Sequence, residues 1–420
     1  MKIRDRYIMT ELGEIPEKWE VKKLVDLCNI ITKQTGFDYT STIKPNLLSE
    51  YRINTVPMLQ TKNFKGVNID LNTDFYIPKD IAFGFPKILL NQKCLLFSIV
   101  GASVGNIGLF NEKSIAFLGG AICVAKFIDI DDVELVYYSM LSIIGQKQIK
   151  HITKGGAQAT ITIEDIRELK IPRPPLSEQQ RIVKILSSNE ELITKTYELI
   201  KKAKEIKQGL MQELLTKGIE HSDFKDSDLG RIPKEWEVYG AGDIFESVSI
   251  KNYPHERVLT VTQDRGTIYR DDCGINIKTD SSSLRNFKLV HNGNFIISLR
   301  SFQGGIENTN LRGIVSPAYT VLSNIKPINE TFFKYFFKSQ KFINILDSAV
   351  IGIRDGKQIS YEVFKSLLIP YPPLEEQQEI ASILSSIDNK IKVLSKRKQQ
   401  LEEIIQGLMQ DLLTGKVRVN

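Results

Sequence analysis

The sequence has none of the long hydrophobic segments that mark membrane or secreted proteins. Among its 420 residues, no apolar run approaches the roughly 18 residues of a membrane-spanning helix, and a run such as CLLFSIV (94–100) ends at Gly101. The N-terminus, MKIRDRY, lacks the apolar core of a signal peptide. These absences predict a cytoplasmic protein with no membrane partner.

Residues that form disulfides or bind metal ions are few and scattered. The sequence has four cysteines without a CxxC pair, and four histidines without ligand or triad spacing. This arrangement favours reduced cysteines in a hydrophobic core over disulfides or a metal site. The residues are Cys28, Cys94, Cys123, Cys273, His151, His221, His255 and His291.

Motifs for nucleotide binding and catalysis are also missing. The glycine-rich GASVGNIG (101–108) does not fit GxGxxG, and there is no GxxxxGK[ST]. RPPL (173–176) and YPPL (371–374) are similar to the (Asn/Asp)-Pro-Pro-aromatic motif of amino-methyltransferases, but both lack the Asn or Asp and the aromatic residue. No carboxylate–lysine cluster of the nuclease kind is recognisable. The sequence therefore predicts a non-catalytic chain that binds no cofactor of its own.

Composition sets broad limits. A hydrophobic fraction of 42% and a charged fraction of 25% are ordinary for a globular protein, and the length predicts two or three domains. The net charge of +6 permits a polyanionic partner without requiring one, because basic residues can be confined to one face.

What the sequence does contain is an internal duplication. Three blocks occur twice in the same order: LGEIPEKWEV (12–21) and LGRIPKEWEV (229–238), IPRPPLSEQQRIVKILSS (from Ile171) and IPYPPLEEQQEIASILSS (from Ile369), QGLMQELLT (208–216) and QGLMQDLLT (406–414). The offset falls from 217 to 198, so the second copy has 19 fewer residues in its middle. We expect two similar modules, roughly 7–217 and 224–416, related by a pseudo-twofold axis.

Each copy ends in a predicted long helix that begins after two prolines. Ser177 and Gln180 have the spacing of a capping box in the first copy, and Glu375 takes the position of Ser177 in the second. Apolar residues then follow at alternating steps of four and three, which is coiled-coil spacing. Each helix of about 37 residues would be about 55 Å long.

We expect the two helices to pair antiparallel, because neither can bury its apolar seam alone. The expected seam consists of Ile182, Leu186, Ile193, Ile200 and Leu210 with Ile380, Leu384, Ile391, Leu401 and Leu408. A second line is expected to widen the first stripe toward a domain: Ile185, Leu192, Leu199 and Ile206. Polar seam residues are candidates to set the register: Asn189, Thr196, Lys207 and Lys398. The alternative is that each helix packs separately on its own domain.

The segments between the repeated blocks, roughly 22–170 and 239–368, have the pattern of α/β (α+β) modules. They alternate short apolar runs with Gly, Asn, Pro and Thr. LLFSIVGASVGNIG (95–108) parallels FIISLRSFQGGIEN (295–308), and KGGAQATITIEDIRELKIP (154–172) parallels GIRDGKQISYEVFKSLLIP (352–370). The apolar positions agree and the polar turn residues differ. Two related readers of two different targets would have this pattern.

The polar residues at these turns are candidate DNA contacts, because Arg, Lys, Gln and Asn side chains bind base edges and phosphates. A single polar loop residue is as often merely solvated, so the prediction rests on the set. The candidates are Lys33, Gln34, Gln60, Lys62, Ser103, Asn106, Lys154, Gln158 and Thr160 in the first module, and Arg265, Arg270, Arg300, Ser301, Gln303, Asn308, Arg354, Lys357 and Gln358 in the second.

The duplicated blocks and divergent middles resemble the specificity (S) subunits of type I restriction–modification enzymes over almost the whole chain. The resemblance implies two target-recognition domains (1–170 and 219–368), each reading half of a split DNA site, and two spacer helices (171–218 and 369–420). The chain departs from the family where Gly-Thr-Pro is frequent: it has KQTGFDY (33–39) and SIKNYPH (249–255). The first contact loop therefore stays undefined.

The resemblance also implies partners. They are double-stranded DNA with a bipartite site, two modification subunits that carry S-adenosylmethionine and methylate adenine, and restriction subunits that cut. S-adenosylmethionine, ATP and Mg would be bound by those subunits, and the family offers no catalytic residues to place here. The alternative is a duplicated, coiled-coil-braced scaffold that binds protein or glycan.

Overall fold

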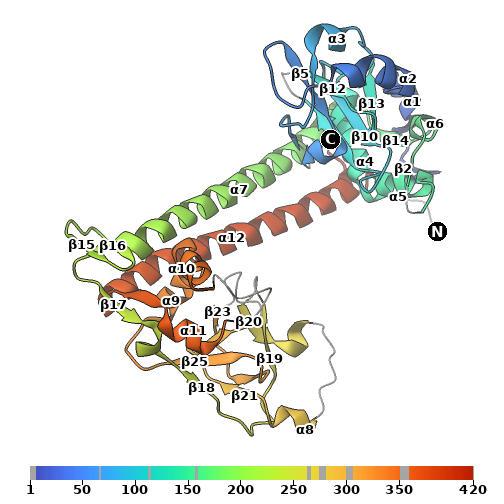
Figure 1. The fold of residues 1–420 in the computed structure, drawn as a ribbon. Coiled ribbons are helices and arrows are strands. Elements are labelled where there is room, and N and C mark those ends of the chain that lie inside the picture. Colours follow the sequence, from blue (N-terminus) through green and yellow to red (C-terminus); the bar gives the residue numbers. More distant parts are fainter. Residues whose placement is uncertain are drawn as a thin grey trace. The chain divides into compact units, whose positions relative to one another are not determined.

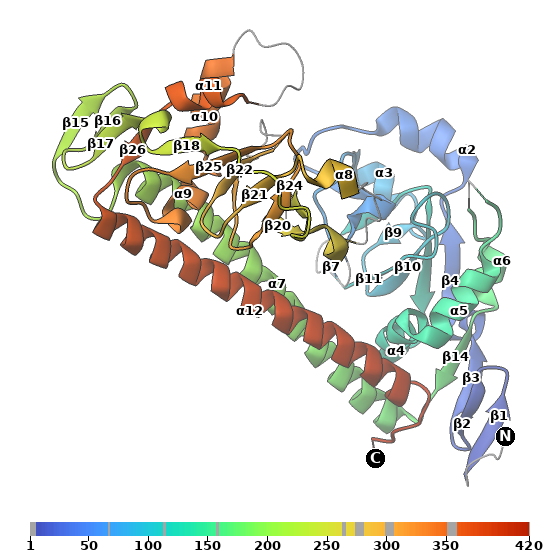
Figure 2. The same cartoon turned by 90° about the horizontal axis from the view of Figure 1, so that it is seen from below.

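The computed structural model describes residues 6–65, 68–111, 115–156, 159–262, 266–273, 281–298, 306–350 and 359–419. The chain forms two compact units: unit 1 comprises Met1–Tyr197 and Lys396–Asn420, and unit 2 comprises Glu198–Ser395 (Figures 1 and 2). Helices α7 (Leu176–Lys217) and α12 (Leu374–Leu412) each contribute one part to unit 1 and one part to unit 2.

Unit 1 contains two four-stranded sheets. The first is antiparallel, with the order β11 (Ile107–Phe110), β10 (Cys94–Ser98), β13 (Ile122–Phe127), β4 (Cys28–Lys33). The second has the order β8 (Tyr76–Pro78), β5 (Thr55–Leu59), β12 (Ala116–Leu118), β9 (Leu89–Leu90). Strands β5 and β12 run parallel. Every residue of β10 and β13 is buried, as their nearly unbroken apolar sequences predict.

Short hairpins and helices complete unit 1. The elements are β1 (Tyr7–Thr10), β2 (Gly13–Pro16), β3 (Glu20–Lys23), α1 (Leu24–Leu27), α2 (Gly36–Asp38), β6 (Phe64–Lys65), β7 (Asn68–Ile69), α3 (Lys79–Phe83), α4 (Asp131–Leu141), α5 (Ile143–Ile152), α6 (Ile163–Arg167) and β14 (Lys170–Arg173). Single turns of π- or 3₁₀-helix cover Tyr39–Ile43, Lys44–Asn46 and Thr61–Asn63. Strand β14, which leads into α7, pairs with β3.

Unit 2 repeats the main sheet of unit 1. Its antiparallel sheet has the order β23 (Ile306–Asn308), β22 (Phe295–Ile297), β25 (Thr320–Asn324), β18 (Phe245–Val248). The other elements are β15 (Phe224–Ser227), β16 (Gly230–Pro233), β17 (Glu237–Gly240), β19 (Leu259–Thr262), β20 (Gly266–Tyr269), α8 (Ser281–Leu284), β21 (Lys288–Val290), β24 (Gly313–Val315), α9 (Glu330–Phe336), α10 (Gln340–Val350), α11 (Tyr361–Ser366) and β26 (Leu368–Tyr371), with 3₁₀ turns at Ala241–Asp243 and Arg270–Cys273. The duplication seen in sequence is thus a duplication of fold.

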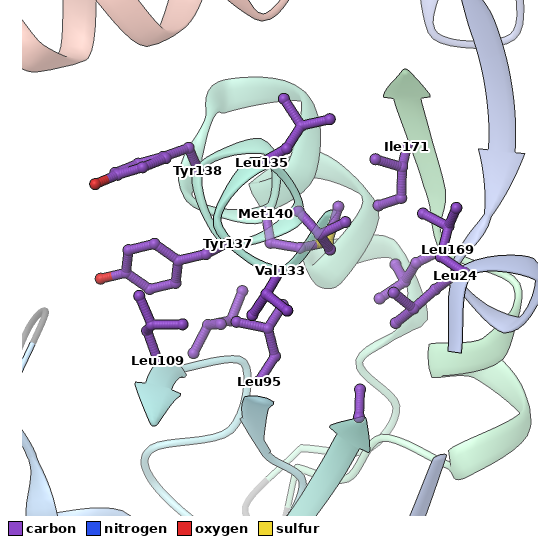
Figure 3. Packing of buried hydrophobic residues seen from close by; sticks show 14 of the residues in the cluster. Leu24, Leu95, Leu109, Val133, Leu135, Tyr137, Tyr138, Met140, Leu169 and Ile171 are labelled. Carbon is purple, nitrogen blue, oxygen red and sulfur yellow. The ribbon is translucent and has the colours of Figure 1, made fainter. Parts of the chain in front are cut away.

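The main core of unit 1 lies between the first sheet and helix α4. Figure 3 shows Val133, Tyr137 and Met140 of this helix packed near Leu95 and Leu109, which come from β10 and β11. The same cluster includes Ile182 and Leu186 of α7 and Ile405, Met409 and Leu412 of α12. Helix α12, although last in sequence, therefore completes the core of the first module.

Within each unit, one part of α7 packs antiparallel to one part of α12. In unit 1 the start of α7 shares a core with the end of α12, and in unit 2 the end of α7 (Leu214, Leu215) shares a core with the start of α12 (Ile380, Leu384). All ten seam residues expected from the sequence are buried or half-buried. The helices have 42 and 39 residues.

Two details of the expected helices are wrong. In the second apolar line Ile185 is half-buried, but Leu192, Leu199 and Ile206 are 42%, 52% and 49% exposed, so the line does not cover a domain. Helix α7 begins at Leu176, one residue before the expected cap Ser177. The amides of residues 178 and 179 donate to the Pro175 carbonyl, which leaves Ser177 inside the first turn.

The polar seam residues differ in what they bind. Asn189, Thr196 and Lys398 form hydrogen bonds within their own helices, to Ile185, Leu192 and Glu402 respectively. Lys207 instead reaches the opposite helix, where its Nζ lies 2.7 Å from Oδ1 of Asp388. Of these four residues, Lys207 alone links α7 to α12 through a side-chain hydrogen bond, within unit 2.

The free cysteines of the described region lie in or near the core of unit 1: Cys94 and Cys123 are buried and Cys28 is half-buried. Burial raises the pKa of Cys94 and of Cys123 to about 12, so both thiols stay protonated. None of the described helices combines the length and the hydropathy that crossing a lipid bilayer requires. The described residues also include no group of three or more His, Cys, Asp or Glu placed to hold a metal ion.

Candidate nucleic-acid interface

The turn between β10 and β11 in unit 1 is held by backbone hydrogen bonds. The amide of Ser98 donates to the carbonyl of Asn106 (2.9 Å), and the amide of Gly105 donates to the carbonyl of Ser98 (2.9 Å). Gly101 and Gly105 have φ values of +92° and +87°, which other residues rarely adopt. The turn therefore needs both glycines, and it presents Ser103 and Asn106 in fixed positions.

A second predicted loop lies against this turn. Lys154 and Thr160 exchange two backbone hydrogen bonds of 2.9 Å, and Thr160 also forms a bridge with Val100. Four candidates, Ser103, Asn106, Lys154 and Thr160, thus come from two adjoining loops of unit 1. The Lys154 ammonium is already paired with Asp165 (2.8 Å), and this contact lowers the pKa of the Asp165 carboxyl.

A cleft of about 700 Å³ opens beside the turn. Its lining includes Phe64, Asn106, Lys147, Lys150 and Gln406. The two lysines belong to α5 and were not among the candidates from sequence. Their spacing of three residues puts them on one helix face. Surface lysines on helices are common, so these two could not be singled out from sequence.

The remaining candidates of unit 1 lie around β4 and β5. Lys33 is exposed at the end of β4. Gln34 is 5% exposed, donates to the carbonyl of Leu118, and lines a pocket of about 330 Å³ together with Gln60. Lys62 is paired with Asp74. The structure therefore places Gln34 and Gln60 together in one pocket, whose lining includes neither Asn106 nor Lys154.

In unit 2 the structure describes two of the nine candidates. Asn308 uses its amide to donate to the carbonyls of Gly293 and Asn294, and Arg270 is half-buried with its guanidinium 5.9 Å from the ring of Phe287. The others, together with Gln158 of unit 1, lie outside the described residues: Arg265, Arg300, Ser301, Gln303, Arg354, Lys357 and Gln358.

Unit 2 also has a cleft, of about 680 Å³, between β23, α9 and α7. Three lysines line it, but two are paired: Lys338 with the buried Glu307 (2.9 Å) and Lys207 with Asp388 (2.7 Å). Lys334 is the third. Each unit thus has a cleft beside its edge strand, β11 or β23, but the lysine-bearing helices that line it are α5 in unit 1 and α9 and α7 in unit 2.

Most of the chain matches one known protein family. The family model described as type I restriction modification DNA specificity domain matches residues 16–207 and 233–403. The chain belongs to this family. As a type I restriction–modification specificity subunit, it is a non-catalytic component of a complex with other subunits of the system.

Relatives and solved structures agree with that assignment. The MjaX and MjaVIII specificity subunits of Methanocaldococcus jannaschii are each 29% identical, over 99% and 96% of this chain and 97% and 94% of theirs. The crystal structure of the M. genitalium type I S subunit has a TM-score of 0.59 at 17% identity, covering 98% of both chains. A chain from a structural study of type I complex assembly and conformational transition has a TM-score of 0.54 at 17% identity, covering 96% of this chain and 99% of its own. These two structures share the fold.

Each unit of the specificity subunit joins its module to the helix pair through a glutamate, which is buried in unit 1 (Glu178) and half-buried in unit 2 (Glu376). In unit 1, Glu178 accepts a hydrogen bond from Trp19 (3.0 Å) and two from Arg418 (2.6 and 2.7 Å). Burial acts to raise the pKa of Glu178, but the bonds from Arg418 and Trp19 outweigh it and the net shift is downward. The carboxylate therefore stays ionised.

In unit 2 the repeat places Glu376 at the corresponding position. Its carboxylate accepts a hydrogen bond from Trp236 (2.7 Å) and one from the amide of Ile219 (3.0 Å), and it lies 2.9 Å from Nε2 of His221. A histidine thus occupies the place that Arg418 takes in unit 1. The Glu–Trp contact is common to both specificity-subunit modules, whereas the basic partner differs.

A second pair of carboxylates lies where the modules contact the helices. Glu190 in α7 accepts hydrogen bonds from Tyr138 (2.6 Å) and Tyr137 (3.3 Å), and burial raises the pKa of Glu190 to about 6. At the same repeat position in unit 2, Asp388 accepts from Tyr335 (2.7 Å) and pairs with Lys207.

Proposed function

We propose that each module of this specificity subunit reads one half of a bipartite DNA site. The observation that carries this proposal is the same strand order in both units combined with different polar residues at the β-turns. In unit 1 the reading surface would be formed by Ser103, Asn106, Lys154 and Thr160. Asn is a residue that forms paired hydrogen bonds with a base edge in the major groove.

The domain limits proposed for this function are 1–170 and 219–368 for the two readers. The segments 171–218 and 369–420 would be the spacer. In this proposal the helix pair fixes the distance between the half-sites, and the bases between them are not read. Half-sites on one side of the duplex would be about 10 bp apart, centre to centre.

Exposed apolar residues on α7 support a docking role for the helices. In unit 2, Leu199 and Ile206 are 52% and 49% exposed and lie seven residues apart, so they share a helix face. Leu192, in unit 1, is 42% exposed. We assign this line to the docking of two modification subunits. Those subunits would carry S-adenosylmethionine, and restriction subunits would bring ATP and Mg, in the cytoplasm where the DNA lies.

Site selection from a randomised DNA pool tests this function. The full chain, assembled with its modification subunits, should select two short defined sequences separated by unspecified bases. Insertion of about four residues, one helical turn, after Thr196 should lengthen the spacer by one or two base pairs, because the insertion adds about 6 Å of helix and each base pair rises about 3.4 Å. Both half-site sequences should be retained.

A matched variant with four conservative substitutions in the same turn of α7, and no insertion, should select the original spacer. An unchanged spacer in the insertion variant, or altered half-site sequences, would contradict the proposed role of the helices. The absence of any bipartite site in the wild-type selection would contradict the proposed function itself.

A further inference from the structure

The cleft beside α5 in unit 1 carries positive charge that its lining does not balance. Lys147 and Lys150 line it, and no carboxylate residue is among its lining residues. Both lysines are exposed, and within the described ranges of the chain neither one forms an ion pair. A cleft with two unpaired ammonium groups attracts a phosphate group.

Asn106 adds an uncharged side-chain amide to the same cleft. Its side chain is exposed and makes no hydrogen bond to any residue that the structure describes. The amide can therefore donate one hydrogen bond and accept another at the same time. The major-groove edge of adenine offers the matching acceptor and donor. Gln146, which also lines the cleft, is less free, because its amide donates to the carbonyl of Met140 (2.8 Å).

The turn and α5 are held close together. A Cβ on Gly105 would lie 2.7 Å from Cγ2 of Ile149, so the turn packs directly on the buried side of α5. Gln148 on the same helix exchanges hydrogen bonds of 2.9 and 3.0 Å with the backbone of Lys170. The distance from Asn106 to the lysines is therefore set by packing and does not depend on a mobile loop.

The cleft of unit 2 has fewer unpaired positive charges than the cleft of unit 1. Glu307 and Asp388 each neutralise one of its lysines, so Lys334 is left as the lysine without a carboxylate at ion-pair distance in the described region. Asn308, on the strand edge there, already uses its amide within the fold. Of the two clefts, unit 1 has the one suited to a nucleic-acid backbone.

We propose that the unit 1 cleft binds a DNA backbone phosphate through Lys147 and Lys150, and that this contact positions Asn106 to read the neighbouring base. The inference rests on the proposed function, since it deepens the account of the first half-site. It separates two roles within one cleft: the lysines hold the backbone without regard to sequence, and Asn106 distinguishes bases.

The salt dependence of DNA affinity separates these roles. Each phosphate contact contributes about 0.9 to the slope of log affinity against log salt. Because the two lysines share one phosphate, the Lys147→Ala, Lys150→Ala double variant should reduce that slope by about 0.9, so the loss of affinity between 50 and 200 mM salt should shrink about 3.5-fold. The reduction should be the same for the selected site and for a scrambled duplex, measured with the full chain in its complex with the modification subunits.

Lys18→Ala is the charge-matched control, because Lys18 is exposed in unit 1 in the connection between β2 and β3. It should leave the slope unchanged. Asn106→Ala should also leave the slope unchanged, while it weakens the selected site about 5- to 150-fold relative to a site altered in the first half, as for a lost bidentate base contact of about 1–3 kcal/mol.

Two outcomes would overturn the inference while leaving the proposed function intact. One is a Lys147→Ala, Lys150→Ala double variant whose salt slope equals that of Lys18→Ala. The other is a double variant whose DNA slope is normal but whose assembly with the modification subunits is weakened, which would assign the cleft to an acidic protein segment. A wild-type complex that prefers no bipartite site would instead contradict the proposed function.

Discussion

The two units hold a carboxylate at the same repeat position but balance its charge differently. In unit 1, Glu190 accepts hydrogen bonds from two tyrosines, and Glu134 nearby adds further negative charge. In unit 2, Asp388 has one tyrosine and the ammonium of Lys207. The offset of 198 places Ile405, a core residue, where unit 2 has Lys207. The duplication has kept the geometry of the helix pair and changed its charges.

The junctions between module and helix pair also differ in their cations, but here it is unit 1 that has the permanently charged partner. Unit 1 pairs Glu178 with a guanidinium, which is charged at every physiological pH, whereas unit 2 pairs Glu376 with the imidazole of His221. Each unit therefore has one carboxylate with a permanent cation and one without, at different places. Similar folds can thus respond differently to pH and to substitution.

The largest effect is expected from the junction of unit 1. Glu178→Gln should destabilise unit 1 by about 2–3 kcal/mol at pH 8, because it leaves the partly buried guanidinium of Arg418 without its counter-charge. Glu376→Gln should cost unit 2 only about 1 kcal/mol, since glutamine still accepts hydrogen bonds from Trp236 and the backbone. Urea unfolding, with hydrogen exchange monitored separately in each unit, measures both changes in unfolding free energy.

Because the pKa of Glu178 is lowered in the folded protein, its contribution is present above pH 4.5 and is lost as the pH falls through the folded pKa. Equal costs for the two substitutions at pH 8 would show that the basic partner does not distinguish the junctions.

A smaller effect of opposite sign is expected at Glu190. Its pKa of about 6 lies above the ordinary 4.5, so unit 1 should lose about 2 kcal/mol of stability as the pH rises from about 4.5 to about 6. Glu190→Gln should remove this dependence and stabilise unit 1 by about 1–2 kcal/mol at pH 8. Asp388→Asn, the matched change in unit 2, should destabilise by about 1 kcal/mol because Lys207 loses its partner.

The two tryptophans allow each unit to be followed separately, since Trp19 belongs to unit 1 and Trp236 to unit 2. In a Trp236→Phe background, fluorescence-detected urea unfolding at pH 5, 6, 7 and 8 reports unit 1. A Glu190→Gln variant that is less stable than its parent at pH 8 would contradict this prediction, because it would show that the surroundings of Glu190 stabilise its ionised carboxylate.

The smallest effect concerns the tyrosines. Tyr138→Phe should cost about 1 kcal/mol at pH 8 and less at pH 5, because its 2.6 Å hydrogen bond is stronger to an ionised carboxylate. Tyr137→Phe, whose bond is 3.3 Å long, is the internal control and should cost about half as much. Unit 2 has Phe336 at the position of Tyr138, so the effect should have no counterpart there. Equal losses for the two variants at both pH values would mean that packing, not the hydrogen bond, is affected.

Periodic features of this chain were predictable from sequence. The duplication, the mixed helix–strand modules and the seam from Ile182 to Leu408 follow from repeated blocks and from steps of four and three, and the structure buries or half-buries every seam residue. The exposed line Leu192, Leu199, Ile206 was predicted wrongly, because an apolar spacing does not reveal which surface covers it.

Contacts between distant segments were not predictable. The pairing of Glu190 with Tyr138 joins residues 52 positions apart, and that of Glu178 with Arg418 joins residues 240 apart. Neither pair has a sequence pattern of its own. For the DNA contacts, the loops of Asn106 and Lys154 were candidates from sequence. The lysines of α5 became candidates only because the structure shows that they line a cleft.

The discontinuity of unit 1 has a consequence for how the chain folds during synthesis. Unit 2 is one continuous segment, whereas unit 1 needs residues from both ends of the chain. The core around Ile182 and Leu186 is completed by Met409 and Leu412, and the contact of Glu178 requires Arg418. On the ribosome, the module made first must therefore wait for the last turns of α12 before its core is complete.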